Sequence, residues 1–305
     1  MADLILHHYP MSPFSEKIRA MLGYTGLSWQ SVITREMPPR PLLARLAGGY
    51  RKIPVAQIGA DIFCDSRTIA AEIAAISGKP ELALENGTPE MQAYVAEVDL
   101  TIFFACLFAA GTPTLNRKVW ESMSLADIGR FLWDRINMGR KARVRAISPL
   151  QAKPRVKQHL ADVEQKLSGD FLFGPVPTHA DFSTYHSLWF VHELAESPLL
   201  REYPRTLAWM GRMNAFGHGD RWEITAEAAL EIAGKATPRT IPAEHRQDPL
   251  IGSRVQIAPN DYGQIPTDGI LAGATASTWI LARHDAELGN LHLHFPKQGF
   301  QLTTQ

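Results

Sequence analysis

Near the start of the chain, segments with the apolar spacing of strands alternate with segments that have the apolar spacing of helices. Short apolar runs predict strands at Leu4–His8 and Trp29–Ile33, and apolar positions three and four apart predict helices. Ser12 followed by Pro13 starts a helix that Gly26 ends, because a capping hydroxyl and a proline at the first helical position favour helix initiation. A short helix at Pro38–Leu46, a hairpin at Pro54–Cys64 and a helix that starts at Asp65 or Ser66 and ends at Gly78 complete the unit.

The rest of the chain changes pattern twice. Residues 79–88 carry several helix breakers and predict a linker after a first α/β domain at 1–78. Residues 89–236 predict an all-helical domain, with helices at 90–110, 124–140, 154–168, 180–196, 204–214 and 223–233. Residues 237–305 combine prolines, turn sequences and period-two alternation, which predicts a small β-rich module appended to the helical domain.

Composition and charge narrow the class of protein. Apolar residues make up 45% of the 305 residues, and 31 basic side chains balance 31 acidic ones, which is typical of a globular protein and does not favour nucleic acid as a partner. A basic cluster at 140–145 is interpreted as a solvated helix face. Two cysteines exclude a disulfide framework, and the apolar stretch Thr101–Gly111 is too short to span a membrane, so we expect a cytoplasmic protein.

Three short motifs of the first domain carry candidate chemistry. Ser12 stands where a strand meets a helix N-terminus, and such a position offers a hydroxyl and exposed N–H groups to an anion. Ile53-Pro54 precedes a strand, and Asp65-Ser66 starts a further helix. Each motif alone is explained as an ordinary helix cap or turn. Their order and spacing within one small domain give them more weight.

In that order, the motifs resemble the thioredoxin-like domain of cytosolic glutathione transferases. The resemblance implies a glutathione transferase fold, in which an α/β thioredoxin-like domain precedes an all-α domain, here with an additional C-terminal β module. Thr178 and Asp181 resemble the buried capping box of the family's helical domain, a structural motif in which side chains satisfy N–H groups at a helix start.

The resemblance also implies roles for individual residues. Ser12 matches the catalytic serine of theta-like and zeta-like classes and the cysteine of omega-like relatives, and it would donate a hydrogen bond to the glutathione sulfur. Pro54 matches the family's cis-proline, and the backbone of Ile53 would pair with the cysteinyl part of glutathione. Asp65 would bind the γ-glutamyl ammonium group, and Ser66 its carboxylate. With no cysteine at positions 12 and 15, a mixed-disulfide mechanism is disfavoured.

Other parts of the site are less sharply defined by sequence. The glycyl carboxylate of glutathione needs a cation, and Arg40, Arg51 and Lys52 all lie in the right stretch, with Lys52 favoured. The predicted pocket for the second substrate contains aromatic and apolar residues, namely Tyr9, Met11, Phe14, Phe103 and Phe104, although aromatic residues at helical spacing are more often core.

No metal site is predicted. His292 and His294 share one strand face, and the third ligand that a metal needs is offered nearby in sequence only by His284 or Asp285. The two histidines are therefore interpreted as solvent-facing residues opposite an apolar strand face.

These observations predict a glutathione transferase, a homodimer by resemblance, that activates the glutathione thiol through Ser12 for attack on a hydrophobic electrophile, as in detoxification. One alternative keeps the fold and changes the reaction to a glutathione-dependent isomerisation, lyase or dehalogenase reaction. Another is a non-catalytic protein that uses the same fold for binding or regulation, since a fold alone does not define a function.

Overall fold

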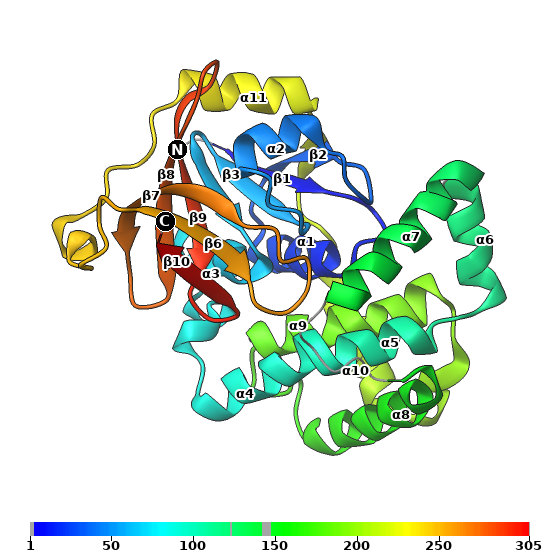
Figure 1. The fold of residues 1–305 in the computed structure, drawn as a ribbon. Coiled ribbons are helices and arrows are strands. Elements are labelled where there is room, and N and C mark those ends of the chain that lie inside the picture. Colours follow the sequence, from blue (N-terminus) through cyan, green and yellow to red (C-terminus); the bar gives the residue numbers. More distant parts are fainter. Residues whose placement is uncertain (1–2, 123, 142–147, 305) are drawn as a thin grey trace.

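The computed structural model describes residues 3–122, 124–141 and 148–304. The basic cluster predicted at 140–145 falls outside the residues whose side chains are described. The chain builds one ten-stranded sheet, with helices on both faces and a layer of helices to one side (Figure 1).

The first domain has the predicted order of elements. They are β1 (Leu4–His8), α1 (Pro13–Thr25), β2 (Trp29–Ile33), α2 (Pro41–Ala47), β3 (Val55–Ile58), β4 (Asp61–Cys64) and α3 (Ser66–Ser77). Helix α2 begins later than predicted, after a cis Pro38–Pro39 bond. Strand β1 pairs in parallel with β2 and antiparallel with β3, and β3 pairs antiparallel with β4. This is the thioredoxin-like arrangement that the sequence predicted.

The helical layer follows two short 3₁₀ turns at Pro80–Leu82 and Leu84–Asn86. It contains α4 (Pro89–Glu97), a π-helical turn (Val98–Ile102), α5 (Phe103–Ala109), α6 (Pro113–Ser122), α7 (Leu125–Lys141), α8 (Pro149–Lys166), α9 (His179–Trp189) and α10 (Pro204–Ala215). A further π-helical turn at Phe190–Leu194 and a 3₁₀ turn at Pro198–Glu202 join α9 to α10. Helix α6 was not predicted, and α8 starts earlier than predicted, with Pro154 inside it.

Helices α4 and α5 and the π-helical turn between them form one continuous helix, Pro89–Ala109. By length and composition alone this helix is apolar enough to cross a membrane, a property that the core helix of a soluble protein shares. Here it packs in the helical layer against α8 and α9.

The predicted all-helical range 89–236 departs from the structure at its end. Residues Arg221–Glu223 form a short strand, β5, that adds to the sheet in parallel beside β2. Helix α11 (Ala226–Lys235) then lies against α2 and β2 rather than within the helical layer. This segment therefore belongs to the sheet.

The β-rich extension is present but is not appended to the helical domain as predicted. After a 3₁₀ turn at Ala243–Arg246, its strands are β6 (Arg254–Pro259), β7 (Thr267–Ala274), β8 (Thr278–Asp285), β9 (Gly289–Pro296) and β10 (Phe300–Thr304). Strand β9 pairs in parallel with β4, so the extension continues the thioredoxin-like sheet, in the order β10-β6-β7-β8-β9-β4-β3-β1-β2-β5.

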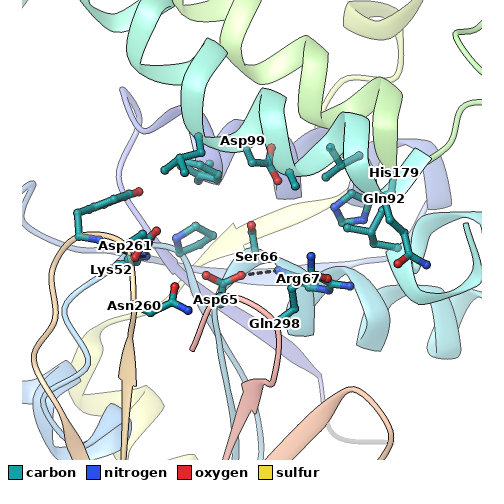
Figure 2. A pocket seen from close by; sticks show the side chains of 18 of the residues that line it. Lys52, Asp65, Ser66, Arg67, Gln92, Asp99, His179, Asn260, Asp261 and Gln298 are labelled. Carbon is teal, nitrogen blue, oxygen red and sulfur yellow. Dashed lines mark hydrogen bonds and ion pairs between the residues drawn. The ribbon is translucent and has the colours of Figure 1, made fainter. Parts of the chain in front are cut away.

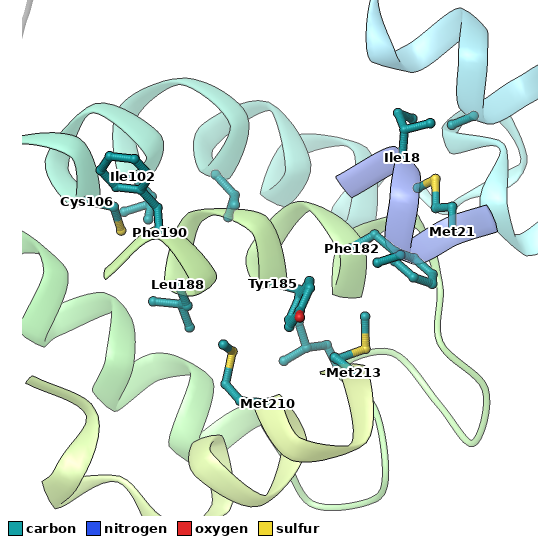
Figure 3. Packing of buried hydrophobic residues seen from close by; sticks show 14 of the residues in the cluster. Ile18, Met21, Ile102, Cys106, Phe182, Tyr185, Leu188, Phe190, Met210 and Met213 are labelled. Carbon is teal, nitrogen blue, oxygen red and sulfur yellow. The ribbon is translucent and has the colours of Figure 1, made fainter. Parts of the chain in front are cut away.

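Two apolar cores lie on the two faces of this sheet, because neighbouring side chains of a strand point to opposite faces. Leu4 and Leu6 join a core formed with α1, α3 and the helical layer, where Ile18 and Met21 of α1 lie near Phe182 of α9 (Figure 3). On the other face, side chains of α2, α11 and the extension form a second core, which includes Leu43, Leu46, Leu230, Leu281, Leu293 and Phe295. The extension is therefore part of the main body of the molecule.

Candidate active site

A cavity of about 240 Å³ opens where the sheet, the helical layer and two loops of the extension meet (Figure 2). The first domain lines it with Phe14, Tyr50, Lys52, Ile53, Pro54, Asp65, Ser66 and Arg67. The second 3₁₀ turn contributes Leu84, and the helical layer contributes Gln92, Val95, Ala96, Asp99, Leu100 and His179. The extension adds Asn260, Asp261, Tyr262, Gln298 and Gly299. Five residues predicted to bind glutathione, Lys52, Ile53, Pro54, Asp65 and Ser66, thus lie around one cavity.

Polar residues at the N-terminus of α3 line this cavity. Asp65 is the N-cap of α3, and its Oδ1 accepts a hydrogen bond from the Arg67 backbone N–H at 3.0 Å. The Tyr50 hydroxyl donates to its Oδ2 at 3.5 Å. Burial raises the pKa of Asp65, against the lowering effect of the Lys52 charge. Asp65 adopts a positive φ of 87°, so the backbone there is held in a conformation that non-glycine residues rarely adopt.

Ser66, the first residue of α3, lies beside Asp65 and lines the cavity. The Ile53–Pro54 peptide bond is cis, as the resemblance implied, and both residues line the cavity just before β3. A helix N-terminus suits a carboxylate, and a buried carboxylate such as Asp65 suits an ammonium group. This end of the cavity therefore has the chemistry to hold an α-amino acid group.

Ser12 is positioned by the junction of β1 and α1. It is the N-cap of α1, and its Oγ accepts a hydrogen bond from the Ser15 backbone N–H at 3.2 Å. Ser12 is only 3% exposed and does not itself line the cavity, whereas Phe14, two residues further on, does. Within the described part of the chain, the Ser12 hydroxyl donates no hydrogen bond to another residue.

Of the five predicted pocket residues, only Phe14 lines the cavity. The ring of Phe103 packs against the ring of Phe14, with the ring centres 4.9 Å apart. Phe103 thus contacts a residue that lines the cavity. The ring of Phe104 packs against the ring of Tyr262, with the ring centres 5.4 Å apart. Tyr9 and Met11 are partly buried, and the Tyr9 carbonyl accepts a hydrogen bond from Arg19 at 3.2 Å. Phe103 and Phe104 therefore contact residues that line the cavity, whereas Tyr9 and Met11 are not among the lining residues.

Asp99 lies on the helical side of the cavity, across from Ser66 and Asp65 (Figure 2), and was not predicted. It stands on the π-helical turn between α4 and α5, where its Oδ2 accepts a hydrogen bond from the fully buried Lys17 at 2.8 Å. Burial raises the pKa of Asp99, but the charge of Lys17, its hydrogen bond and the nearby His186 and His179 together lower it below the usual value. Its Oδ1 atom is buried and has no hydrogen-bond partner among the described residues.

His179 lines the same side of the cavity. Its Nδ1 lies 2.8 Å from the Leu82 carbonyl oxygen, which only accepts hydrogen bonds, so Nδ1 carries the proton and Nε2 is an acceptor. Burial, together with the charge of Lys17, lowers the pKa of His179 to about 3. Its Nε2 has no partner among the described residues. Two buried acceptor atoms, on Asp99 and His179, therefore belong to residues that line the cavity. Neither residue was predicted: Asp99 stands within a helix without a recognisable motif, and His179 stands within an ordinary capping motif.

Lys52, the favoured cation for the glycyl carboxylate, is already paired. Its Nζ lies 2.8 Å from both carboxylate oxygens of Asp261 and 4.1 Å from the centre of the Tyr262 ring. The other two candidates are also engaged. Arg40 donates to three backbone carbonyls, those of Arg35, Glu36 and Arg51, and Arg51 pairs with Asp134 at 2.6 Å.

The histidines of β9 are not solvent-facing as predicted. The ring of His294 stacks on Phe63 with centres 4.5 Å apart, and its Nε2 lies 2.8 Å from Asp61 Oδ1. The side chains of His292 and His294 are 17% and 13% exposed. The cause is the pairing of β9 with β4, which sets His292 opposite Asp61. Within residues 3–122, 124–141 and 148–304, no group of three or more His, Cys, Asp or Glu side chains is arranged to hold a metal ion.

Comparison with known proteins agrees with this geometry. A thioredoxin-like sheet followed by a helical layer, with a cis-proline and a helix N-terminus around one cavity, defines a protein of the glutathione transferase fold. Two family models match the chain, "Glutathione S-transferase, N-terminal domain" over residues 6–81 and "Glutathione S-transferase, C-terminal domain" over residues 129–216. A search of curated proteins found no match.

Solved structures extend the similarity to the whole chain. A GST-like protein from Pseudomonas syringae is 34% identical, and the match covers 100% of both chains with a TM-score of 0.75. A glutathione S-transferase from Sinorhizobium meliloti is 18% identical over 70% of this chain and 89% of that chain, with a TM-score of 0.50. A glutathione transferase family member from Pseudomonas fluorescens, solved with two glutathione bound, is 16% identical over the same shares, with a TM-score of 0.49. The chain belongs to the glutathione S-transferase family.

Proposed function

We propose that this protein is a glutathione transferase in which the Ser12 hydroxyl donates a hydrogen bond to the glutathione sulfur and so stabilises the thiolate. The observation that carries the proposal is the position of Ser12 at the N-cap of α1, two residues before Phe14. Phe14 lines the same cavity as the cis-proline Pro54 and the Asp65-Ser66 pair.

The energetics of thiol activation are compatible with these groups. A free thiol has a pKa of about 8.5, and the neutral form is a poor nucleophile. Lowering this pKa by about two units requires roughly 2.7 kcal/mol of preferential stabilisation of the thiolate. A hydrogen bond to a charged acceptor contributes about 1.5–3 kcal/mol, and a helix N-terminus about 0.3–1 kcal/mol. One serine hydroxyl at the start of α1 can therefore supply thiolate stabilisation of the required size.

We assign the γ-glutamyl and cysteinyl groups of glutathione to this cavity in the order that family resemblance implies. Asp65 would hold the γ-glutamyl ammonium group, and Ser66, with the N–H groups at the start of α3, would hold its carboxylate. The backbone of Ile53 would pair with the cysteinyl residue. The apolar lining by Leu84 of the second 3₁₀ turn and by Val95, Ala96 and Leu100 of the helical layer supports an apolar part of the second substrate.

A second candidate function is a glutathione-binding protein without transferase activity. One observation favours it: Ser12 is nearly fully buried and does not line the cavity. A glutathione-dependent isomerase, lyase or dehalogenase would use the same first step. Assays with maleyl-type substrates and with aryl halides separate isomerisation from substitution.

Replacement of Ser12 tests the catalytic assignment. Ser12→Ala is expected to lower kcat/KM for a reactive aryl halide at least tenfold, because it removes the donor to the sulfur. Ser12→Thr, which keeps both hydroxyl and cap, is expected to retain most activity. Ser15→Ala is the matched control, since the Ser15 hydroxyl is buried without a partner among the described residues.

The outcomes separate the candidates. Unchanged turnover in Ser12→Ala would reassign the role to Ser15 or Tyr9. Glutathione binding with no turnover of either substrate class by the wild-type protein would favour the binding protein. Thermal unfolding of each variant controls for the loss of the helix cap, which contributes about 1 kcal/mol.

We also infer a cytoplasmic homodimer that takes part in detoxification. The inference rests on family resemblance and on Cys64 and Cys106, which are buried and unpaired, as in proteins of reducing compartments. Light scattering of the purified protein tests the dimer, because a monomeric mass at micromolar concentration contradicts it.

A further inference from the structure

The loop between β6 and β7 enters the cavity at the end that holds Lys52. The loop begins after Pro259, where β6 ends, and its Asp261 side chain meets Lys52 Nζ with both carboxylate oxygens at 2.8 Å. The Tyr262 ring covers the same ammonium group at 4.1 Å and also contacts Phe104 of α5. The loop therefore bridges the sheet and the helical layer across this end of the cavity.

The contact between Lys52 and Asp261 is largely shielded from solvent. The two side chains are 14% and 23% exposed. Both residues line the cavity, and Figure 2 shows them together at one end of it, next to Asn260, with Asp65 and Ser66 further along. A ligand that reaches from Ser66 to Lys52 would therefore meet the Asp261 carboxylate as well.

The charges around the cavity leave no cation ready for a second ligand carboxylate. Among the described residues, two cationic side chains line the cavity, and each pairs with a carboxylate: Lys52 with Asp261 and Arg67 with Glu85. The carboxylate Asp99 is balanced by Lys17. Asp65 completes the charged lining and is the group suited to an ammonium ion. A carboxylate at the Lys52 end would have to displace or approach Asp261, and two like charges in a partly buried site repel each other.

We propose that Asp261 determines specificity at the C-terminal end of the thiol substrate. Asp261 pairs with Lys52, the cation that would otherwise bind a glycyl carboxylate. The site therefore favours a γ-glutamylcysteinyl thiol whose C-terminal end is an uncharged carboxamide. A carboxamide N–H donates to Asp261 while Lys52 stays paired, and the amide side chains of Asn260 and Gln298 also line the cavity. The inference rests on the proposed glutathione site and adds to it the chemistry of one end of the ligand.

The test compares binding of glutathione with binding of glutathione amide, its C-terminal carboxamide, by calorimetry. The wild-type protein is expected to bind the amide at least about tenfold more tightly, and raising the salt concentration is expected to reduce that ratio, because the discrimination is electrostatic. Asp261→Asn keeps the side-chain shape and is expected to remove most of the ratio by strengthening glutathione binding. Asp285→Asn is the matched control, since it removes a carboxylate paired with Arg45 outside this cavity.

Each outcome of these binding measurements either supports or overturns the inference. Equal or tighter binding of glutathione by the wild-type protein would overturn the inference while leaving the proposed glutathione site intact. An unchanged ratio in a folded Asp261→Asn variant would also overturn it. Binding of neither ligand would overturn both this inference and the proposed function. If Asp261→Asn does not fold, the wild-type ratio and its salt dependence still decide the matter.

Discussion

Buried histidines are the residues of this protein that respond most directly to acid. His159 on α8 is 3% exposed, and its Nε2 has no hydrogen-bond partner among the described residues. Burial, with a smaller effect of Arg155, lowers its pKa from 6.5 to about 4. The unfolded chain therefore binds a proton between these pH values that the folded chain does not. This part of the stability is present above about pH 6.5 and is lost as the pH falls toward about 4.

Replacement of His159 by leucine should remove this sensitivity. Between pH 7 and pH 5, we expect His159→Leu to lose about 2 kcal/mol less stability than the wild-type protein, as measured by urea unfolding. His284, which is exposed on β8, provides the control: His284→Leu should follow the wild-type pH dependence. Identical pH dependence in His159→Leu and the wild type would contradict the account.

At the scale of the element, the start of α9 shows how one carboxylate can organise a helix. The predicted capping box of Thr178 and Asp181 is confirmed. Asp181 accepts hydrogen bonds from the backbone N–H groups of Leu172 and Thr178, each at 2.9 Å, and from the Trp209 indole N–H at 3.1 Å. Asp181→Ala would leave these donors buried without an acceptor, and we expect it to destabilise the fold by about 3 kcal/mol or more.

Ser183, on the same helix, is the control for this prediction. Its hydroxyl is buried with no partner among the described residues, so Ser183→Ala should be neutral or slightly stabilising in urea unfolding. A loss of stability below about 1 kcal/mol in Asp181→Ala would contradict the assigned role of the capping box.

At the scale of the whole molecule, α1 joins the sheet to the helical layer through a close backbone contact. A Cβ atom on Gly23 would lie 2.2 Å from the Gly217 carbonyl oxygen and 2.4 Å from that of Phe216, so only glycine fits. We expect Gly23→Ala to cost about 3 kcal/mol or more in thermal or urea unfolding, because backbone atoms cannot give way as a side chain does. Gly129→Ala, in an exposed part of α7 with open space around it, should instead be neutral or stabilising by up to about 1 kcal/mol. Similar stability of Gly23→Ala and the wild type would disprove this tight contact.

Features that depend on short stretches of sequence were predictable. The helix starts at Ser12 and Thr178, the turn at Gly59 and the order of elements in the first domain all follow from local capping and alternation. Helix α6 was missed because it is short and none of its residues is buried, so few apolar positions mark it in the sequence. Strand β5 was missed because it is three residues long and fully exposed.

The site was predictable only in its local part. Ile53-Pro54 and Asp65-Ser66 could be found because their motifs are short and ordered along the chain. The pairing of β4 with β9 and of Lys52 with Asp261 joins residues more than two hundred positions apart. No local pattern specifies such a pairing, since strand register is set by which apolar faces meet in the folded sheet. The contribution of the extension to the cavity could therefore emerge only from the structure.

If Ser12 lowers the pKa of a bound glutathione thiol, as we propose, a titration of that thiol in the complex reveals the shift. The ultraviolet absorbance of the thiolate is followed against pH in the complex of the wild-type protein and in that of Ser12→Ala. We expect a thiol pKa about two units below its free value of about 8.5 in the wild-type complex, and a return toward that value in the variant. A bound thiol that titrates near 8.5 in the wild-type protein would contradict the proposal.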